Sequence, residues 1–215
     1  MKILAMIPAR GGSTRVKRKN IRTICGKPLI AWAIEACKKS ELLDKFVVST
    51  EDSEIAKVAK EYGAEVLDRP KELSGKYVSM IDVLQHTVES FPDYDAIMLL
   101  QPTSPVRING IIDRCINLFN IYKPDSLSTG YECKLHAWTD SRYEALGPSQ
   151  NKKGWFYADG TVEIHKREVI LAGKSFGNKR VKVPVPEYYN QDIDTELDVI
   201  KAEAVMKYLG MDKNG

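Results

Sequence analysis

Apolar runs alternate with amphipathic stretches up to about residue 131, and this alternation restricts the possible fold more than any other feature. Residues 3–8, 46–50 and 96–100 are strand-like runs, and a stretch with helical spacing of its apolar residues follows each of them. Strands that are apolar on both faces are typical of a parallel sheet that is covered by helices. The sequence therefore predicts an α/β fold with a mainly parallel sheet.

The predicted elements continue to the end of the chain, which at 215 residues fits a single domain over 1–215. Strands are expected at 3–8, 46–50, 65–67, 96–100, 126–131, 161–165 and 180–185. Helices are expected at 28–39, 53–62, 79–90, 109–122 and 195–209. Ser53 is the expected N-cap of the second helix, and Ile30, Ile34 and Cys37 are expected to share one face of the first.

The composition excludes several classes of protein. The net charge of +3, from 32 basic and 29 acidic residues, is too small to indicate a nucleic-acid or membrane partner. The four cysteines form no C-x-x-C pair, and no run of 18 apolar residues exists. We therefore expect a cytoplasmic protein with reduced cysteines, no membrane span and no structural zinc.

A basic, glycine-containing segment directly follows the first apolar run. Its eleven residues, RGGSTRVKRKN at 10–20, hold two glycines, five cations and no acid. Glycines let backbone N–H groups turn toward an anion, and Arg and Lys add charge-assisted hydrogen bonds to phosphate oxygens. The segment matches neither of the familiar phosphate-loop patterns. It is interpreted as a polyphosphate site, and a solvated basic turn is the alternative.

A pair of carboxylates occurs near the end of the chain, in the segment 191-QDIDTE-196. Asp192 and Asp194 flank one isoleucine, so on an extended strand both side chains point to the same side. Magnesium binds through one or two carboxylates and takes its other ligands from water and substrate phosphates. The pair therefore predicts a Mg²⁺ or Mn²⁺ site. The compatible alternative is that Asp194 or Thr195 caps the last helix.

A rigid polar turn, 101-QPTSPVR-107, follows the third apolar run. Pro102 and Pro105 fix its backbone. Four side chains suit sugar hydroxyls, a base edge or a carboxylate: Gln101, Thr103, Ser104 and Arg107. A turn without a ligand remains the alternative.

These segments should meet, because ligands of open α/β sheets bind beyond the carboxyl ends of the strands. The basic loop, the segment 49-STEDS-53 and the turn at 101–107 each follow a predicted strand. The set holds cations, carboxylates and polar groups, with no arrangement of nucleophile, histidine and acid. This pattern favours phosphoryl-group chemistry, in which positioning and electrostatics do most of the catalysis.

The regular alternation stops near residue 133. The segment from 133 to 160 mixes turn residues with Trp138, Trp155, Phe156 and Tyr157. Exposed aromatic patches usually mark contacts, so we expect a dimerisation arm that buries these aromatic side chains against a second subunit. A long surface loop is the alternative.

Six segments in order resemble those of a known family: IPARGGSTRVKRKNI, GKPLIAWAIEA, VVSTEDSEIA, GAEVLDRPKEL, LLQPTSPVR and DIDTELD. They are similar to the cytidylyltransferases that activate acidic nine-carbon sugars (sialic, legionaminic and pseudaminic acids) and to the related octulosonate enzymes. The similarity covers about 1–132 and 158–209. It implies a Rossmann-like nucleotidyltransferase fold, a homodimer, and transfer of CMP from CTP to the anomeric hydroxyl of a 2-keto-3-deoxy acid sugar, with release of pyrophosphate.

The resemblance also implies roles for individual residues. Arg10, Lys19 and Asp194 would be catalytic, with Arg10 and Lys19 on the triphosphate and Asn20 beside them. Asp192 and Asp194 would hold the metal. The other substrate-binding residues would be Ala9, Gly11, Gly12, Ser13, Arg15, Ser79, Gln101, Thr103, Ser104, Arg107 and Asp159.

Three departures from the family pattern carry expectations of their own. Thr14 stands where the family usually has lysine, so Arg15 or Lys17 is expected to supply that charge. Asp159 replaces an asparagine and Glu163 a tyrosine in the sugar-side segment 157-YADGTVEI-164. Two extra acids beside an anionic sugar predict a sugar other than N-acetylneuraminate. Two other functions fit this pattern less well: a nucleotidyltransferase for a sugar phosphate or phosphonate, and a catalytically silent nucleotide-binding homologue.

Overall fold

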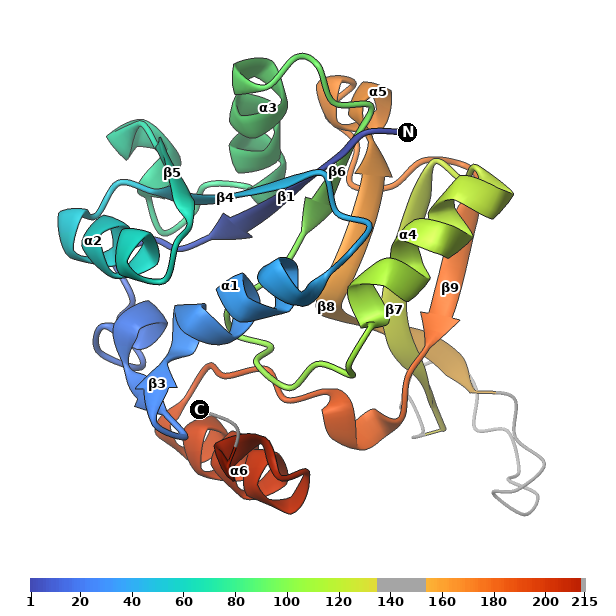
Figure 1. Cartoon of the computed structure of the whole chain (residues 1–215). Coiled ribbons are helices and arrows are strands. Elements are labelled where there is room, and N and C mark those ends of the chain that lie inside the picture. The colour runs from blue at the N-terminus through green and yellow to red at the C-terminus, as the bar shows by residue number, and fades with distance from the viewer. Residues whose placement is uncertain (135–153, 214–215) are drawn as a thin grey trace, which may run out of the picture.

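A seven-stranded sheet with helices on both faces forms the centre of the structure (Figure 1). The computed structural model describes residues 1–134 and 154–213. The strands of the sheet, in chain order, are β1 (Ile3–Pro8), β4 (Lys45–Thr50), β5 (Glu65–Asp68), β6 (Ala96–Leu99), β7 (Ser126–Cys133), β8 (Trp155–Lys166) and β9 (Arg180–Pro184). Their order across the sheet is β5-β4-β1-β6-β8-β7-β9. All seven predicted strands are present.

The sheet is mainly parallel, as predicted. β1 pairs in parallel with β4 on one side and with β6 on the other, and β4 pairs in parallel with β5. Only β8 runs against its neighbours β6 and β7 within this sheet. The chain passes from β1 outward to β5 and then returns to the far side of β1, so the order of the strands reverses between β1 and β6. In open α/β sheets ligands bind at such a reversal.

Each face of the sheet has its own layer of helices. The helices are α1 (Leu29–Lys39), α2 (Ser53–Glu61), α3 (Met80–Ser90), α4 (Ile111–Tyr122), α5 (Arg167–Leu171) and α6 (Glu196–Tyr208). α1, α2 and α4 pack on one face, and α3 and α5 on the other (Figure 1). The predicted α1 face of Ile30, Ile34 and Cys37 is confirmed, because all three lie in the first of these cores. Residues of β1 alternate between the two cores, which is why its apolar run has no polar face.

The five predicted helices are present with ends that differ by at most two residues, α5 was not predicted, and the predicted N-cap of α2 is wrong. Asp52, not Ser53, is the N-cap, because its carboxylate accepts from the backbone N–H groups of Glu54 and Ile55. Ser53 is therefore the first helical residue. Thr195 caps α6 through a capping box with Asp198, which satisfies that helix end without Asp194.

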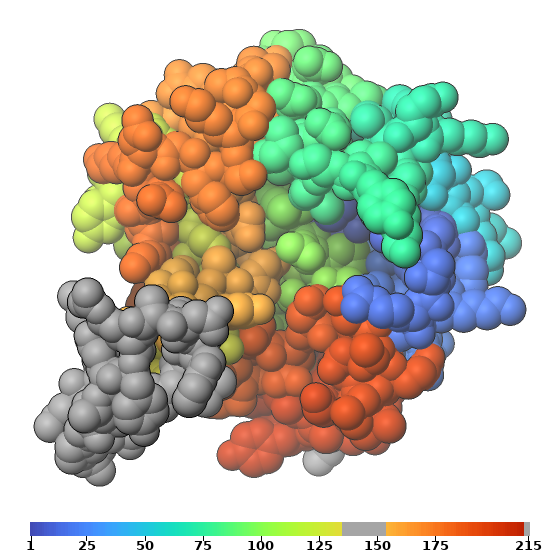
Figure 2. Space-filling model, turned by 180° about the vertical axis from the view of Figure 1, so that it is seen from behind, coloured from blue at the N-terminus to red at the C-terminus, as the bar shows by residue number. Residues whose placement is uncertain are grey.

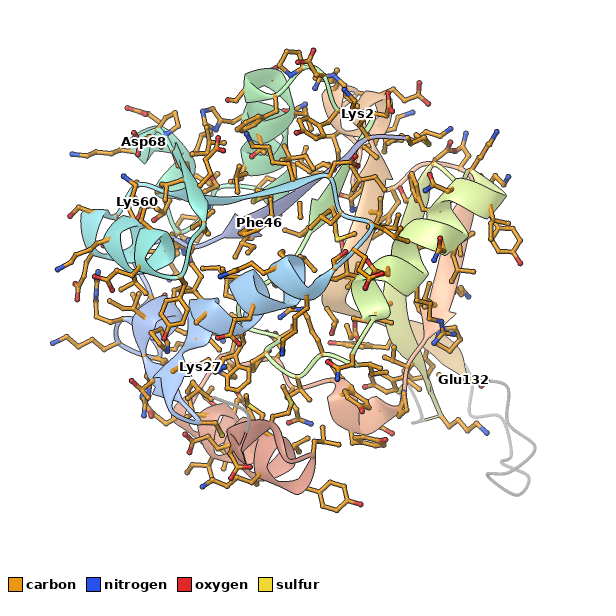
Figure 3. The ribbon with its side chains drawn as sticks, in the orientation of Figure 1. Lys2, Lys27, Phe46, Lys60, Asp68 and Glu132 are labelled. Carbon is orange, nitrogen blue, oxygen red and sulfur yellow. The ribbon has the colours of Figure 1, made fainter. Side chains whose placement is uncertain are left out.

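A third core lies under α6, beside a short hairpin that we did not predict. The hairpin joins β2 (Thr23–Ile24) to β3 (Lys27–Pro28), and its two-residue turn is Cys25–Gly26, both with positive φ. Lys27 lies beside α1 (Figure 3), where its ammonium is 2.7 Å from Glu35 and 4.2 Å from the centre of the Trp32 ring. The 3-10 turns η1 (Lys19–Ile21), η2 (Lys71–Ser74), η4 (Glu187–Tyr189) and η5 (Met211–Lys213) complete the described elements.

The ends of the predicted arm are strand, which corrects the boundary at both sides. Residues 131–133 of β7 pair with residues 155–157 of β8, and Gly154 donates to the carboxylate of Glu132. Trp155 and Tyr157 are about half exposed on this ladder, with exposed fractions of 45% and 49%. Trp138 and the rest of 135–153 lie outside the described residues. Among the residues that are described, no helix has the length and apolar character to cross a membrane.

Candidate active site

A cleft of about 320 Å³ lies at the carboxyl ends of β1 and β6, where the strand order reverses. Pro8 and Arg10 line it after β1, and Gln101, Pro102 and Thr103 line it after β6. Figure 2 shows a hollow on this face of the molecule, with the segment near residue 100 recessed between segments near residues 15, 75 and 190. Two of the three predicted strand ends, the loop after β1 and the turn after β6, line the cleft, whereas no residue of 49–53 does.

Half of the predicted site residues line this cleft. They are Arg10, Ser13, Arg15, Lys19, Asn20, Gln101, Thr103 and Asp194. The other half do not line it: Ala9, Gly11, Gly12, Ser79, Ser104, Arg107, Asp159 and Asp192.

Acidic residues after β4 hold the basic loop in place. The guanidinium of Arg18 binds both carboxylate oxygens of Asp52, at 2.6 and 3.0 Å, and also contacts Glu54. Gly11 N–H donates to Glu51 at 2.8 Å. A Cβ on Gly11 would lie 2.3 Å from Asp52 Oδ2, so only glycine fits there. Part of the loop's positive charge is therefore structural.

Asp52 links the loop to α2, and its charge should contribute to stability. Arg18 and the helix amides hold the pKa of Asp52 at about 2, below its ordinary 3.8. A lowered pKa stabilises the fold above pH 4, and the contribution is lost as the pH falls from 4 toward 2.

We therefore expect Asp52→Asn to lower the free energy of unfolding by about 1–2 kcal/mol at pH 7, after allowance for solvent screening of Arg18. Urea unfolding at pH 7 and pH 3 measures this, and the deficit should shrink at pH 3. Asp93→Asn is the control, because Asp93 is an exposed carboxyl that precedes the amino end of β6, whereas the loop follows the carboxyl end of the parallel strand β1. If the loss in the free energy of unfolding were the same at pH 7 and pH 3, the charge of Asp52 would contribute nothing to stability.

Asp194 lies opposite the loop and is held by two of its cations. Lys19 Nζ donates to Asp194 Oδ1 at 3.0 Å and to the carbonyl of Ile193, and Arg15 Nη2 lies 2.7 Å from Asp194 Oδ2. The Lys19 side chain is only 16% exposed while that of Asp194 is 39% exposed, so this contact is partly shielded from solvent. Because Thr195 caps α6, the Asp194 carboxylate points into the cleft and not at the helix end.

The carboxylates of this segment suit a magnesium ion in part. Asp194 presents hard oxygen ligands inside the cleft, while Asp192, on the other side of the buried Ile193, is exposed and does not line it. No cluster of three or more His, Cys, Asp or Glu that could hold a metal occurs among residues 1–134 and 154–213. A site with one or two carboxylates fits Mg²⁺, which shares its coordination with phosphates and water.

The first part of the loop is ordered by its own hydrogen bonds. Asn20 is 5% exposed, and its side-chain amide donates to the carbonyl of Arg10. Arg10 donates to the carbonyl of Gly75 across the cleft, and Ser13 N–H donates to the carbonyl of Gly11. Two of the three amides predicted to meet phosphates, those of Gly11 and Ser13, are therefore engaged within the protein.

Arg15 is the residue that supplies charge near Thr14. Both residues line the cleft, whereas Lys17 is exposed and does not.

Arg69 is a cleft residue that sequence reasoning missed. It is 6% exposed, lines the cleft after β5 and donates to the hydroxyl and the carbonyl of Ser49. Burial lowers the pKa of this guanidinium, and Arg10 lowers it further, against a counteracting effect of Glu51. The signal was present in the sequence, because Arg69 directly follows a predicted strand, as the other cleft segments do.

The turn after β6 connects the two sides of the cleft. The carbonyl of Thr103 accepts from Ile193 N–H at 2.8 Å, which ties the turn to the segment that carries Asp194. Gln101 and Thr103 line the cleft next to this contact. Loop, turn and carboxylate therefore form one connected unit.

The remaining predicted residues lie behind the cleft or cap a helix. Ser104, Arg107 and Asp159 are buried, with exposed fractions of 2%, 8% and 6%, and they bond to other groups of the protein. Ser79 caps α3, and Ala9 is part of the core.

Glu163 also lies away from the cleft. Its carboxylate is 3.3 Å from the ring of His165, and it does not line the cleft. Since Asp159 does not line the cleft either, the two acids give no electrostatic reason to exclude N-acetylneuraminate.

Comparison with known sequences gives one family over nearly the whole chain. The pattern of the family described as cytidylyltransferase matches residues 4–210. The CMP-N,N'-diacetyllegionaminic acid synthase of Legionella pneumophila is 31% identical, and the match covers 96% of this chain and 97% of that protein. The N-acylneuraminate cytidylyltransferase of Escherichia coli is 39% identical over 118 residues, which is 55% of this chain and 28% of the longer protein.

Solved structures share the fold at lower identity. A CMP:2-keto-3-deoxy-manno-octonic acid synthetase complexed with CTP superimposes with a TM-score of 0.76 at 15% identity. The match covers 97% of this chain and 100% of that one.

Proposed function

The chain belongs to the cytidylyltransferase family, and from that membership we propose that it transfers CMP from CTP to the anomeric hydroxyl of an acidic 2-keto-3-deoxy sugar. Pyrophosphate is the other product. A relative named as acting on a legionaminic acid derivative supports this class of acceptor, since it matches this chain along almost its whole length.

One observation carries the proposal: a cationic loop and a carboxylate face each other across a cleft at the strand reversal. The loop contributes Arg10, Arg15 and Lys19, and the opposite side contributes Asp194. A triphosphate carries several negative charges, and Arg and Lys bind phosphate oxygens with charge-assisted hydrogen bonds. The cleft therefore has the charges that a nucleoside triphosphate and its cation need.

The proposed reaction is a substitution at the α-phosphorus of CTP. The anomeric oxygen of the sugar forms a bond to that phosphorus and loses its proton to water, while the bond between the α-phosphorus and the bridging oxygen of the β-phosphate breaks and pyrophosphate leaves. Lys19 and Arg15, which bind Asp194 in this structure, would move to the triphosphate and balance the charge that develops on it. Asp194 and Asp192 would hold Mg²⁺, which would supply charge neutralisation at the triphosphate and acidify the attacking hydroxyl.

On the acceptor side, Gln101 and Thr103 offer the polar groups that line the cleft beyond β6. Their amide and hydroxyl groups can donate to a sugar carboxylate or to sugar hydroxyls.

A pyrophosphate-release panel tests the proposed function. The four nucleoside triphosphates are combined in turn with sialic, legionaminic, pseudaminic and octulosonic acids in the presence of Mg²⁺. We expect release with CTP and at least one of these sugars. A sugar 1-phosphate and a phosphonate are tested beside them, and release only with one of these two would contradict the proposed acceptor. Binding of CTP by calorimetry without turnover of any acceptor would indicate a silent homologue.

We also propose that the protein is a homodimer that uses the region 133–160. The exposed Trp155 and Tyr157 of the β7–β8 ladder support this, because half-exposed aromatic side chains are typical of contact surfaces. Light scattering should give the mass of two chains. We expect the double variant Trp155→Ser/Tyr157→Ser to give the mass of one chain, and an unchanged dimer would remove the ladder from the interface.

A further inference from the structure

A buried polar cluster lies behind the floor of the cleft, and no role described so far accounts for it. Arg107, Asp159 and Thr161 are 8%, 6% and 3% exposed. Three side-chain atoms of this cluster, Arg107 Nη1, Asp159 Oδ2 and Thr161 Oγ1, are buried without a hydrogen-bond partner among the described residues. They are half of the six such atoms in that part of the chain. Buried polar groups normally form hydrogen bonds, so three buried atoms without a partner in one cluster require an explanation.

The cluster joins the turn after β6 to strand β8. Arg107 Nη2 donates to the carbonyl of Gln101 at 2.5 Å, and Arg107 Nε donates to the carbonyl of Thr161 at 3.3 Å. Ser104 adds a second link from its hydroxyl to the carbonyl of Asp159. One end of the turn is therefore fixed by a guanidinium that is itself anchored on β8.

Asp159 is also fixed from several sides. Its Oδ1 accepts from the hydroxyl of Thr129 at 2.6 Å and from the N–H of Thr161 at 2.9 Å. The same Thr129 hydroxyl accepts from the N–H of Val162. These bonds hold the carboxylate below the surface, next to the backbone that Arg107 contacts.

The buried guanidinium needs a negative charge nearby. Burial lowers the pKa of Arg107 to about 10, so it stays charged near neutral pH. Its two influential acidic neighbours are Cys37 and Asp159, and burial raises the pKa of Cys37 to about 12, which keeps that thiol neutral. Asp159 is thus the acidic side chain that acts on Arg107, and although no direct ion pair joins the two among the described residues, they meet at Thr161, whose carbonyl accepts from Arg107 Nε and whose N–H donates to Asp159 Oδ1.

The strand segment beside Asp159 is in contact with the side chain of Gln101. Gly160 has a φ of +67°, and a Cβ built on it would lie 2.8 Å from Gln101 Nε2. The Gln101 side chain therefore lies against the backbone of β8 next to Asp159. The backbone carbonyl of Gln101 accepts a hydrogen bond from Arg107. Both ends of this cleft residue depend on the buried cluster.

We propose that Arg107 and Asp159 are positioning residues, which through their hydrogen bonds to the turn and to β8 set the orientation of Gln101 toward the acceptor sugar. The inference rests on the proposed function for the identity of the acceptor. It explains why an aspartate at 159 does not oppose an anionic sugar, because its carboxylate is buried behind the cleft and accepts from Thr129 and Thr161 there.

The first experiment separates acceptor binding from nucleotide binding. In Asp159→Asn and in Arg107→Lys, the KM for the sugar should rise roughly tenfold to a hundredfold, because small misplacements of a positioning group have effects of that size. The KM for CTP should stay within about twofold in each case, since the loop cations are untouched. Arg107→Lys retains the charge and can retain the fold even where Asp159→Asn does not. Glu163→Gln, the same type of charge removal on the same strand, is the control and should change neither KM.

A second comparison asks whether the effect passes through Gln101. In a Gln101→Ala background, Asp159→Asn should add little to the sugar KM, because the side chain that it positions is gone. Fully additive effects, or equal increases in the KM of both substrates, would overturn the proposal and leave a purely structural cluster.

A third readout does not depend on turnover. The side-chain amide signals of Gln101 in a ¹H–¹⁵N spectrum, assigned by their loss in Gln101→Ala, should shift in Asp159→Asn and Arg107→Lys but not in Glu163→Gln. Unchanged signals in both variants would overturn the positioning role. Failure of every sugar in the panel, with shifted Gln101 signals, would overturn the acceptor class and leave the positioning role in place.

Discussion

Asp194→Asn is expected to lower kcat by about a thousandfold while the protein stays folded. The carboxylate is the one acidic group from the 191–196 segment that lines the cleft, and its loss would weaken the hold on the cation that neutralises developing negative charge, an effect of about this size in other enzymes. The fold should tolerate the change, because Thr195 and Asp198 cap α6 without Asp194. The lost contacts to Arg15 and Lys19 are partly exposed pairs that contribute about 1 kcal/mol or less.

The same variant should bind CTP at least as well as the wild-type protein when no metal is present. Asp194 competes with the triphosphate for Lys19 and Arg15, so its neutralisation frees two cations. Calorimetry with CTP in EDTA measures the affinity, and steady-state pyrophosphate release measures kcat. Glu196→Gln, two residues away in an exposed pair with Arg22, is the matched control and should stay within about twofold. Near-normal kcat in Asp194→Asn would remove this residue from the reaction.

Asp192→Asn gives the test of the predicted carboxylate pair. If both carboxylates hold one cation, this variant should also lower kcat and raise the Mg²⁺ concentration that gives half-maximal rate. Its exposed position outside the cleft lining would instead predict a rate close to wild type. A normal rate and normal Mg²⁺ dependence would leave Asp194 as the sole carboxylate of the pair that acts.

The fold was predictable because periodicity and burial agree along this chain. β1, β4 and β6 are apolar runs that lie between two layers of helices, and such runs have few alternatives. The β2–β3 hairpin was not predicted, because its strands have two residues each and Cys25–Gly26 is an unusual pair for such a turn. The N-cap of α2 was placed one residue late, since aspartate and serine cap almost equally well and sequence alone does not show that the Asp52 carboxylate accepts from the N–H groups of Glu54 and Ile55.

The location of the cleft was predictable from topology, but the orientation of its side chains was not. Rules for parallel sheets place every strand end at one edge, and the same rule would have included Arg69. Sequence does not tell which polar side chains of a turn face the ligand and which face inward. Gln101 and Thr103 line the cleft, whereas Ser104 and Arg107, from the same seven-residue turn, are buried. Their inward orientation depends on Asp159 and Thr161, which are more than 50 residues away in the chain.

Lys19→Met is expected to raise the KM for CTP by roughly tenfold to a hundredfold, the usual cost of a lost hydrogen bond to a charged group. Lys19 is the most protected cation that contacts Asp194: its side chain is 16% exposed, against 65% for Arg15. A charge with little solvent around it interacts more strongly with phosphate than an exposed one. Methionine keeps most of the side-chain volume, so packing should change little.

Lys17→Met is the matched control, because it makes the same substitution in the same loop at an exposed position outside the cleft. It should leave the KM for CTP within about twofold, as expected for an exposed charge. Lys19 also donates to the carbonyl of Ile193, so its loss could act by displacing Asp194 and not by weakening phosphate binding. Calorimetry without metal separates the two causes. Weaker phosphate binding lowers the affinity for CTP measured in EDTA, whereas displacement of Asp194 lowers only kcat. An unchanged affinity with a reduced kcat would assign Lys19 to the support of Asp194 and remove it from the triphosphate.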